Sequence, residues 1–214
     1  MTLKIMNNFE IKNKWIDEQT IFVASQSYQA KPFFVESDWS AASYHYALAA
    51  FGEEVDLSLE GLLEESLQGD SVLPEMMQAF GVETVYGDKV VHLTKKKSEL
   101  TSFEYDFVEC PDIAQTLAVI CGGLKVEGCF SGLVTLSIKE TDRTVALQEE
   151  LAKFGISFQQ KQADEWVLTI PSNVSKSENG VKIKQWKYIS EDGKKSLRIL
   201  EHDDQDTFVF LGKK

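Results

Sequence analysis

The sequence contains little cysteine, proline or positive charge. Among its 214 residues are 3 cysteines, 4 prolines and 22 Lys or Arg against 34 Asp or Glu, which gives a formal net charge of −12. This composition excludes collagen-like and low-complexity chains, and the negative charge argues against a nucleic acid or an anionic membrane as the partner. No apolar run approaches the roughly 18 residues of a membrane span, and residues 1–5 show no signal-peptide core, so we expect a cytoplasmic protein.

Familiar site motifs are also missing. The sequence has no GxGxxG, P-loop, GxSxG or HExxH pattern. Cys110, Cys121 and Cys129 show no CxxC spacing, so free buried thiols are expected rather than a disulfide or a zinc site. The three histidines have no spacing typical of metal ligands.

An internal repeat with a period of about 72 residues is the most informative feature. Phe34-Val35-Glu36 precedes a helical pattern, and Phe107-Val108-Glu109 precedes another. A second helical pattern in each copy follows Asp70 or Asp142 and ends in the similar segments Ala79-Phe80-Gly81 and Lys153-Phe154-Gly155. These two glycines fall where a left-handed residue commonly ends a helix.

Each copy is predicted to have the order strand, helix, strand, strand, helix, strand, strand, which is an α/β unit. The first helices, at 41–50 and 113–121, consist mostly of small or apolar residues and should be buried. The closing strand pairs are expected at 82–86 with 90–94 and at 156–160 with 166–170.

The two ends of the chain differ from these copies. Residues 6–11 match 77–82, with Glu10 in the place of a glycine, which indicates a partial third copy unless the match is chance. Residues 172–180 form a polar loop, and strand patterns follow at 181–189, 195–200 and 207–211. The expected organisation is a remnant unit and hinge at 1–30, two βαβαββ units within 31–172 (about 33–94 and 103–171), and a divergent β-rich tail at 173–214.

Candidate chemistry lies at two helix starts in the second copy. Lys139 and Arg143 put cations at the positive end of a helix, which is unfavourable unless an anion binds between them and the free backbone N–H groups. A solvated helix start paired with nearby acids is the alternative. Asp112 begins the other helix, either as an acid favoured by the helix dipole or as a general base. Lys95-Lys96-Lys97 is interpreted as a solvated turn.

Four segments resemble the 3-phosphoshikimate 1-carboxyvinyltransferase (EPSP synthase) family. They occur in the family's order and spacing, and the similarity covers residues 2–171. The "KE(S/T)DR" signature is the most specific of the matched motifs, which also include "VEGDxSSASY", "xxQGD" and "xPDxAxTLA". In this chain the segments are Phe34–Tyr44, Ser66–Asp70, Cys110–Ala118 and Lys139–Arg143.

The resemblance implies two domains, each built from three βαβαββ units in an inside-out barrel. It also implies transfer of the enolpyruvyl group of phosphoenolpyruvate to the 5-hydroxyl of shikimate 3-phosphate, without a metal or redox cofactor. Asp112 would accept a proton and hold shikimate 3-phosphate, and Lys139 would contact the same substrate. Glu140 would transfer a proton at the phosphoenolpyruvate methylene, and Arg143 would bind the phosphoenolpyruvate anion.

Other family motifs are absent from this sequence. The family's early Lys-Ser motif with its nearby arginine cannot be located, and neither the later "DHRxAM" segment nor the "KxxP" segment occurs between Asn173 and Lys214. The two substrates bring a charge of about −6, taking each phosphate near −2, whereas only Lys139 and Arg143 match the family's cations. The prediction is therefore roughly the C-terminal half of an enolpyruvyl transferase, working with a missing N-terminal half or by self-association. A non-catalytic interaction domain and a sister enzyme acting on a nucleotide sugar are the alternatives.

Overall fold

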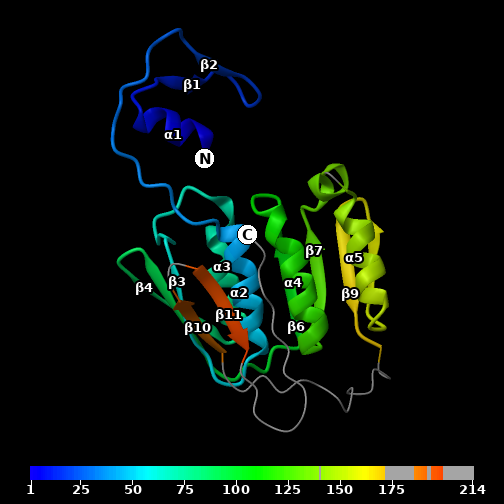
Figure 1. Ribbon diagram of the computed structural model, residues 1–214. Helices are drawn as coiled ribbons and strands as arrows, with labels where there is room; N and C mark the ends of the chain where they lie inside the picture. Colours follow the sequence, from blue (N-terminus) through cyan, green and yellow to red (C-terminus); the bar gives the residue numbers. More distant parts are fainter. Residues whose placement is uncertain (140, 172–185, 192–193, 200–214) are drawn as a thin grey trace.

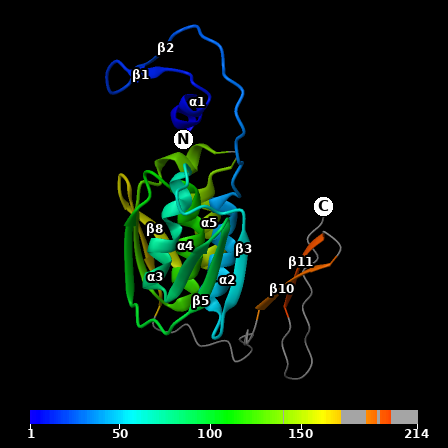
Figure 2. The ribbon, with the colours of Figure 1, turned by 90° about the vertical axis from the view of Figure 1, so that its left-hand side faces the viewer.

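A computed structural model describes residues 1–139, 141–171, 186–191 and 194–199, the last two ranges by their backbone. The described chain is mixed α/β, which confirms the predicted class (Figure 1). An N-terminal arm stands apart from a body made of two sheets and their helices, and a short hairpin lies beside that body (Figure 2). The described residues contain no helix long and apolar enough to cross a bilayer.

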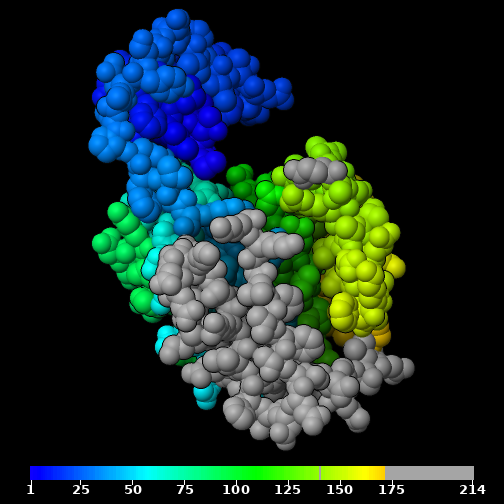
Figure 3. Space-filling view, viewed as in Figure 1, coloured from blue at the N-terminus to red at the C-terminus, as the bar shows by residue number. Residues whose placement is uncertain are grey.

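The arm consists of α1 (Thr2–Asn8) and the antiparallel strands β1 (Asn13–Trp15) and β2 (Ile21–Val23). No residue of α1 is buried, and Trp15 and Phe22 on the two strands are exposed. Glu10, which ends the helix, has a φ of 64°, so the backbone is left-handed at the position where the other copies have glycine. The arm, which projects from the rest of the chain in Figure 3, thus has a left-handed residue at the position that matches Gly81 and presents Trp15 and Phe22 to solvent.

The first half of the body follows a linker without strands. It contains α2 (Trp39–Phe51), β3 (Asp56–Glu60), the 3₁₀ turn η1 (Gly69–Val72), α3 (Leu73–Ala79), β4 (Val82–Gly87) and β5 (Val90–Lys95). The three strands form an antiparallel sheet in the order β3-β5-β4. Strand β3 is thus an edge of this sheet.

The second half has the same succession with one strand more. It contains β6 (Ser102–Asp106), α4 (Pro111–Leu124), β7 (Glu127–Ser131), the 3₁₀ turn η2 (Val134–Ile138), α5 (Arg143–Ala152), β8 (Ser157–Gln162) and β9 (Glu165–Thr169). The sheet order is β6-β7-β9-β8, in which β6 and β7 are parallel and the other pairs antiparallel.

Two details of the predicted order are wrong. The strand expected before α2 is not formed, and residues 24–38 have no strand. The additional strand expected before the second helix of each copy is replaced by a 3₁₀ turn, η1 or η2. None of these three segments forms a ladder with a strand among the described residues, and a strand without a hydrogen-bonding partner is not stable.

The core lies where the two halves meet. Helices α2 and α4 pack together, and the hydroxyl oxygens of Ser43 and Thr116 lie 2.9 Å apart between them. Both helices are largely buried, as their composition predicts. Gly81 and Gly155 have φ values of 79° and 74°, which confirms the predicted left-handed helix ends.

The cysteines are free thiols, as predicted. Cys110 and Cys121 are buried, and burial raises the pKa of each thiol to about 12. Burial also raises the pKa of the partly buried Cys129.

The tail contributes the antiparallel hairpin of β10 (Trp186–Glu191) and β11 (Lys194–Ile199), which fits two of the three strand patterns predicted there. The third pattern, at 207–211, lies outside the described residues.

Candidate active site

Helices α2, α4 and α5 begin at the same end of the body, the upper end in Figure 1. Asp38 caps α2 by accepting a hydrogen bond from the Ser40 amide, and Asp142 caps α5 by accepting from the amides of Thr144 and Val145. Pro111 occupies the first turn of α4 and supplies the fixed φ that suits this position. Three helix starts gathered at one end create a region of positive potential.

Asp112 lies in the first turn of α4 and faces two cations. Its Oδ1 atom is 3.1 Å from Lys139 Nζ, and Arg143 Nη1 donates a hydrogen bond to the same oxygen at 3.1 Å. The side chains of Asp112, Lys139 and Arg143 are 39%, 31% and 28% exposed, so the cluster is half-buried and open to solvent. The structure thus brings together three of the four site residues expected from the sequence.

Glu140, the fourth expected site residue, lies outside the described residues. Its neighbours are described on both sides, since η2 ends at Ile138 and α5 begins at Arg143. The segment Lys139–Arg143 therefore connects a 3₁₀ turn to a capped helix. Arg143 lies in the first turn of α5, where the sequence expected an anion-binding cation.

Asp70 is a member of the cluster that reasoning from the sequence missed. Its side chain is 8% exposed, and Ser40 in the first turn of α2 donates a hydrogen bond to it. Burial raises the pKa of Asp70, the Ser40 hydrogen bond opposes that shift, and the carboxylate of Asp112 raises it further. Asp70 and Asp112 thus lie within electrostatic reach of each other, and each is contributed by a different half of the body.

The loop before η1 is attached to the start of α2 by a set of hydrogen bonds. The Gln68 side chain donates to the Ser37 carbonyl at 2.8 Å and accepts from the Trp39 amide at 2.9 Å. Glu36 accepts from the Ser66 hydroxyl at 2.9 Å. These contacts fix the Gln68-Gly69-Asp70 segment and thereby position Asp70. The "QGD" motif is the feature of the sequence from which Asp70 could have been identified.

Gly69 lies where the first half of the body approaches the chain just before α4. A Cβ atom at this position would collide with the backbone carbonyl of Glu109, just before α4. Glycine is therefore required for the η1 turn to lie against the start of α4. The close approach keeps Asp70 beside the Asp112 cluster.

This arrangement combines groups for acid–base chemistry and for anion binding. The Asp112 carboxylate is half-exposed beside two cations, so it can accept a hydrogen bond or a proton from a substrate hydroxyl. The cations and the helix starts favour phosphate or carboxylate groups. Among the described residues no group of three His, Cys, Asp or Glu could hold a metal ion.

The remaining candidates have local structural partners. Lys96 pairs with Glu83 and Lys97 with Glu99 on the exposed chain after β5, which agrees with the interpretation as a solvated turn. Lys95 does not fit that interpretation, because it ends β5, is partly buried and donates to the Phe80 carbonyl. His92 Nδ1 lies 2.8 Å from the Ser58 hydroxyl on the exposed side of the first sheet.

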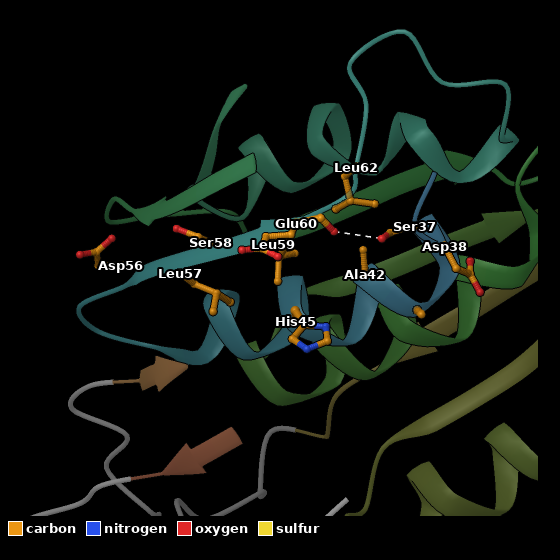
Figure 4. Close-up of a pocket in the computed structure, with 11 residues that line it drawn as sticks. Ser37, Asp38, Ala42, His45, Asp56, Leu57, Ser58, Leu59, Glu60 and Leu62 are labelled. Atoms are coloured by element: carbon orange, nitrogen blue, oxygen red, sulfur yellow. Dashed lines mark hydrogen bonds between the residues drawn. The ribbon is translucent and has the colours of Figure 1, made fainter. Parts of the chain in front are cut away.

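A hollow of about 560 Å³ lies away from Asp112, between α2 and β3 (Figure 4). His45 from α2 and Leu57 and Leu59 from β3 line it, with Asp38 and Asp56 toward its opposite ends.

Comparison with known proteins places these residues in a family. The family model described as EPSP synthase (3-phosphoshikimate 1-carboxyvinyltransferase) matches residues 1–184. The chain therefore belongs to the EPSP synthase family, as its motifs indicated.

Several relatives carry the name 3-phosphoshikimate 1-carboxyvinyltransferase. One from Bacteroides fragilis is 44% identical over 155 residues, covering 72% of this chain and 38% of the relative. Another from Photobacterium profundum is 35% identical over 176 residues, covering 80% of this chain and 39% of the relative. A solved structure of EPSP synthase from Acinetobacter baumannii shares 16% identity and a TM-score of 0.39, covering 64% of this chain and 31% of that one. The chain thus spans about 38% of the length of the first of these relatives.

Proposed function

We propose that this chain is the substrate-binding C-terminal part of an enolpyruvyl transferase. The reaction moves the carboxyvinyl group of phosphoenolpyruvate to the 5-hydroxyl of shikimate 3-phosphate and releases phosphate. The observation that carries this proposal is the Asp112 carboxylate paired with Lys139 and Arg143 at the shared start of three helices. Family membership and the relatives' names support the same reaction.

The chemistry consists of an addition followed by an elimination. In the addition, the 5-hydroxyl oxygen bonds to C2 of phosphoenolpyruvate, the hydroxyl loses its proton and C3 gains one. In the elimination, the C2–O bond to phosphate breaks and C3 loses a proton, which restores the double bond. We assign Asp112 as the acceptor of the hydroxyl proton, because its half-buried carboxylate lies between the two cations that would hold the substrate anions.

The other roles follow from charge and position. Lys139 contacts shikimate 3-phosphate, and Arg143 binds the phosphoenolpyruvate anion near the start of α5. Glu140 is proposed to exchange the proton at C3, on the basis of the matched motif. We propose that no metal or redox cofactor takes part, because each step moves only protons and a leaving group.

We further propose that the body contains two βαβαββ units of the inside-out barrel type, at about 33–94 and 103–171. The arm and hinge at 1–30 would be the end of a preceding unit, and 173–214 a divergent tail. The recurring succession of helix, strand, 3₁₀ turn, helix and two strands supports this division. The left-handed residues Glu10, Gly81 and Gly155 at matching helix ends support it independently.

Activity is proposed to require more protein than this chain. The substrates bring about six negative charges, against Lys139 and Arg143 beside Asp112 and a chain of net charge −12. The exposed apolar side chains of the arm, including Trp15, Phe22 and Tyr28, are typical of a surface that packs against another. We propose the N-terminal half of a family member as that partner, with self-association as the alternative.

The test is phosphate release from phosphoenolpyruvate and shikimate 3-phosphate. The chain would be assayed alone and after mixing with a separately expressed N-terminal half of the Bacteroides fragilis relative. We expect turnover only on mixing, and a loss of about 10²–10⁴-fold with Asp112→Asn, the usual contribution of a general base. Asp88→Asn, in the exposed β4–β5 turn, is the control with the same change of charge.

Turnover by the unmixed chain would contradict the need for a second half. Full activity of Asp112→Asn in the mixture would contradict the assigned base. If the mixture released no phosphate although both parts were folded, the result would favour a non-catalytic domain.

A further inference from the structure

The two halves of the body differ at one strand position. Strand β7 lies between β6 and β9, whereas β3, which follows α2 as β7 follows α4, is paired only with β5 among the described residues. The chain before α2 reaches only the end of β3, where the Ser37 amide donates to the Gly61 carbonyl at 2.7 Å. From there it continues into the linker toward the arm (Figure 1). The outer edge of β3 is therefore an open strand position.

The hollow between α2 and β3 lies at this open position (Figure 4). Its walls include the apolar side chains of Ala42, Leu57 and Leu59. His45 Nδ1 is buried there without a hydrogen-bond partner among the described residues. Unpaired edges that combine backbone donors and acceptors with apolar side chains are suited to the addition of a strand.

We propose that the tail hairpin fills this position, with β10 aligned along the edge of β3. Cα atoms of β10 lie within 8 Å of Cα atoms of β3, and both views show the hairpin on the side of the body that carries β3 and α2 (Figures 1 and 2). The hairpin thus takes the place in the first half that β6 has in the second.

The hairpin's own sequence suits such a contact. Its register pairs Trp186 with Ile199 and Tyr188 with Leu197, whereas Lys187 pairs with Arg198 between them. Directly opposed residues share one face of an antiparallel pair, so the register places Trp186, Tyr188, Leu197 and Ile199 on one face and Lys187, Glu191, Lys194 and Arg198 on the other. A two-stranded hairpin is marginally stable alone and gains stability by packing on another surface.

The experiment is hydrogen exchange of the full chain, followed by mass spectrometry of peptides covering 56–60. Tyr188→Pro removes a backbone donor from β10 and disrupts the strand. Ser177→Pro, in the predicted polar loop, is the matched control. We expect β3 amides to exchange at least about tenfold faster in Tyr188→Pro than in the unaltered chain, with Ser177→Pro unchanged. Unchanged protection of β5 and β7 would show that the body is still folded.

Two results would overturn the proposal. Equal exchange of β3 in the unaltered chain and Tyr188→Pro would mean that β10 does not cover the edge. Protection of β3 that falls on tenfold dilution would mean that a strand of a second copy occupies the position instead.

Discussion

At the level of single residues, the candidate site contains two carboxyl groups, Asp112 and Asp70, that lie in different environments. Asp112 is half exposed and faces Lys139 and Arg143, whereas Asp70 is buried and accepts from the Ser40 hydroxyl. Burial raises the pKa of Asp70 and so favours its protonated form. The cluster therefore combines a carboxyl group that faces two cations with one that is buried beside a hydroxyl.

The raised pKa of Asp70 predicts a particular dependence of stability on pH. The folded chain binds this proton more tightly than the unfolded chain does, so the contribution of Asp70 to stability falls as the pH rises from about 4 through its folded pKa. Asp70→Asn keeps an acceptor for Ser40 but cannot ionise. We expect the stability of Asp70→Asn relative to the parent, measured as the difference between their free energies of unfolding, to be greater at pH 7 than at pH 4.

Urea unfolding at the two pH values measures this difference. Asp88→Asn, in an exposed turn, serves as the control. An Asp70→Asn variant that loses as much stability at pH 7 as at pH 4 would contradict the expected linkage.

The residues of the site differ in how visible they are in the sequence. Lys139 and Arg143 stand in one short segment and conflict with the helix dipole there, so local reasoning identifies them. Asp70 obeys local rules, and the loop that carries it is held by hydrogen bonds to segments about 30 residues away: Ser66 donates to Glu36, and the Gln68 side chain bonds the backbone at the start of α2. The left-handed Gly81 and Gly155 were predictable because a helix end determines them locally.

At the level of elements, the start of α5 contributes both to the stability of that helix and to the position of a site residue. Asp142 accepts from two backbone amides and from the Thr144 hydroxyl, and these hydrogen bonds lower its pKa. A lowered folded pKa means that the cap stabilises α5 above the ordinary pKa of about 4 and that this contribution disappears as the pH falls through the folded value. The same helix start positions Arg143.

We therefore expect Asp142→Ala to lower the melting temperature clearly at pH 7 and only slightly below pH 3. Asp142→Asn should retain most of the stability at pH 7, because Asn caps helices about as well as Asp. Circular dichroism melts at both pH values test this. If Asp142→Ala lowered the melting temperature as much below pH 3 as at pH 7, the loss of stability would not come from the ionised cap.

Elements were predictable where their patterns are local. The strand pairs 82–87 with 90–95 and 157–162 with 165–169 follow from alternation and short turns. The chain before α2 forms no strand, whereas β6 precedes α4, although the segments just before the two helices, Phe34-Val35-Glu36 and Phe107-Val108-Glu109, are alike and both lie outside a strand. A strand depends on its neighbour in the sheet, which a local pattern does not reveal.

At the level of the whole molecule, α2 and α4 join the two halves. The Thr116 hydroxyl lies 2.9 Å from that of Ser43, which itself donates to the Ser40 carbonyl at 2.6 Å near the site. Thr116→Val removes the buried hydroxyl with little change of volume. We expect a loss of about 1 kcal/mol in the free energy of unfolding, the usual net value of one hydrogen bond.

Because the halves share this contact, hydrogen exchange should accelerate equally in β5 and β9. Thr116→Ser, which keeps the hydroxyl, should preserve the coupling between them. Faster exchange confined to one half would show that the halves unfold independently.

The cysteines described above have a practical consequence for studying this protein. Thiolates, not thiols, react with alkylating reagents, and Cys110 and Cys121 are buried with pKa values raised to about 12. The Cys129 thiol also has a raised pKa. A single cysteine introduced on the exposed face of the arm would therefore be the fast-reacting thiol at neutral pH. The arm could then carry a fluorophore that reports docking to another protein, with every native cysteine left in place.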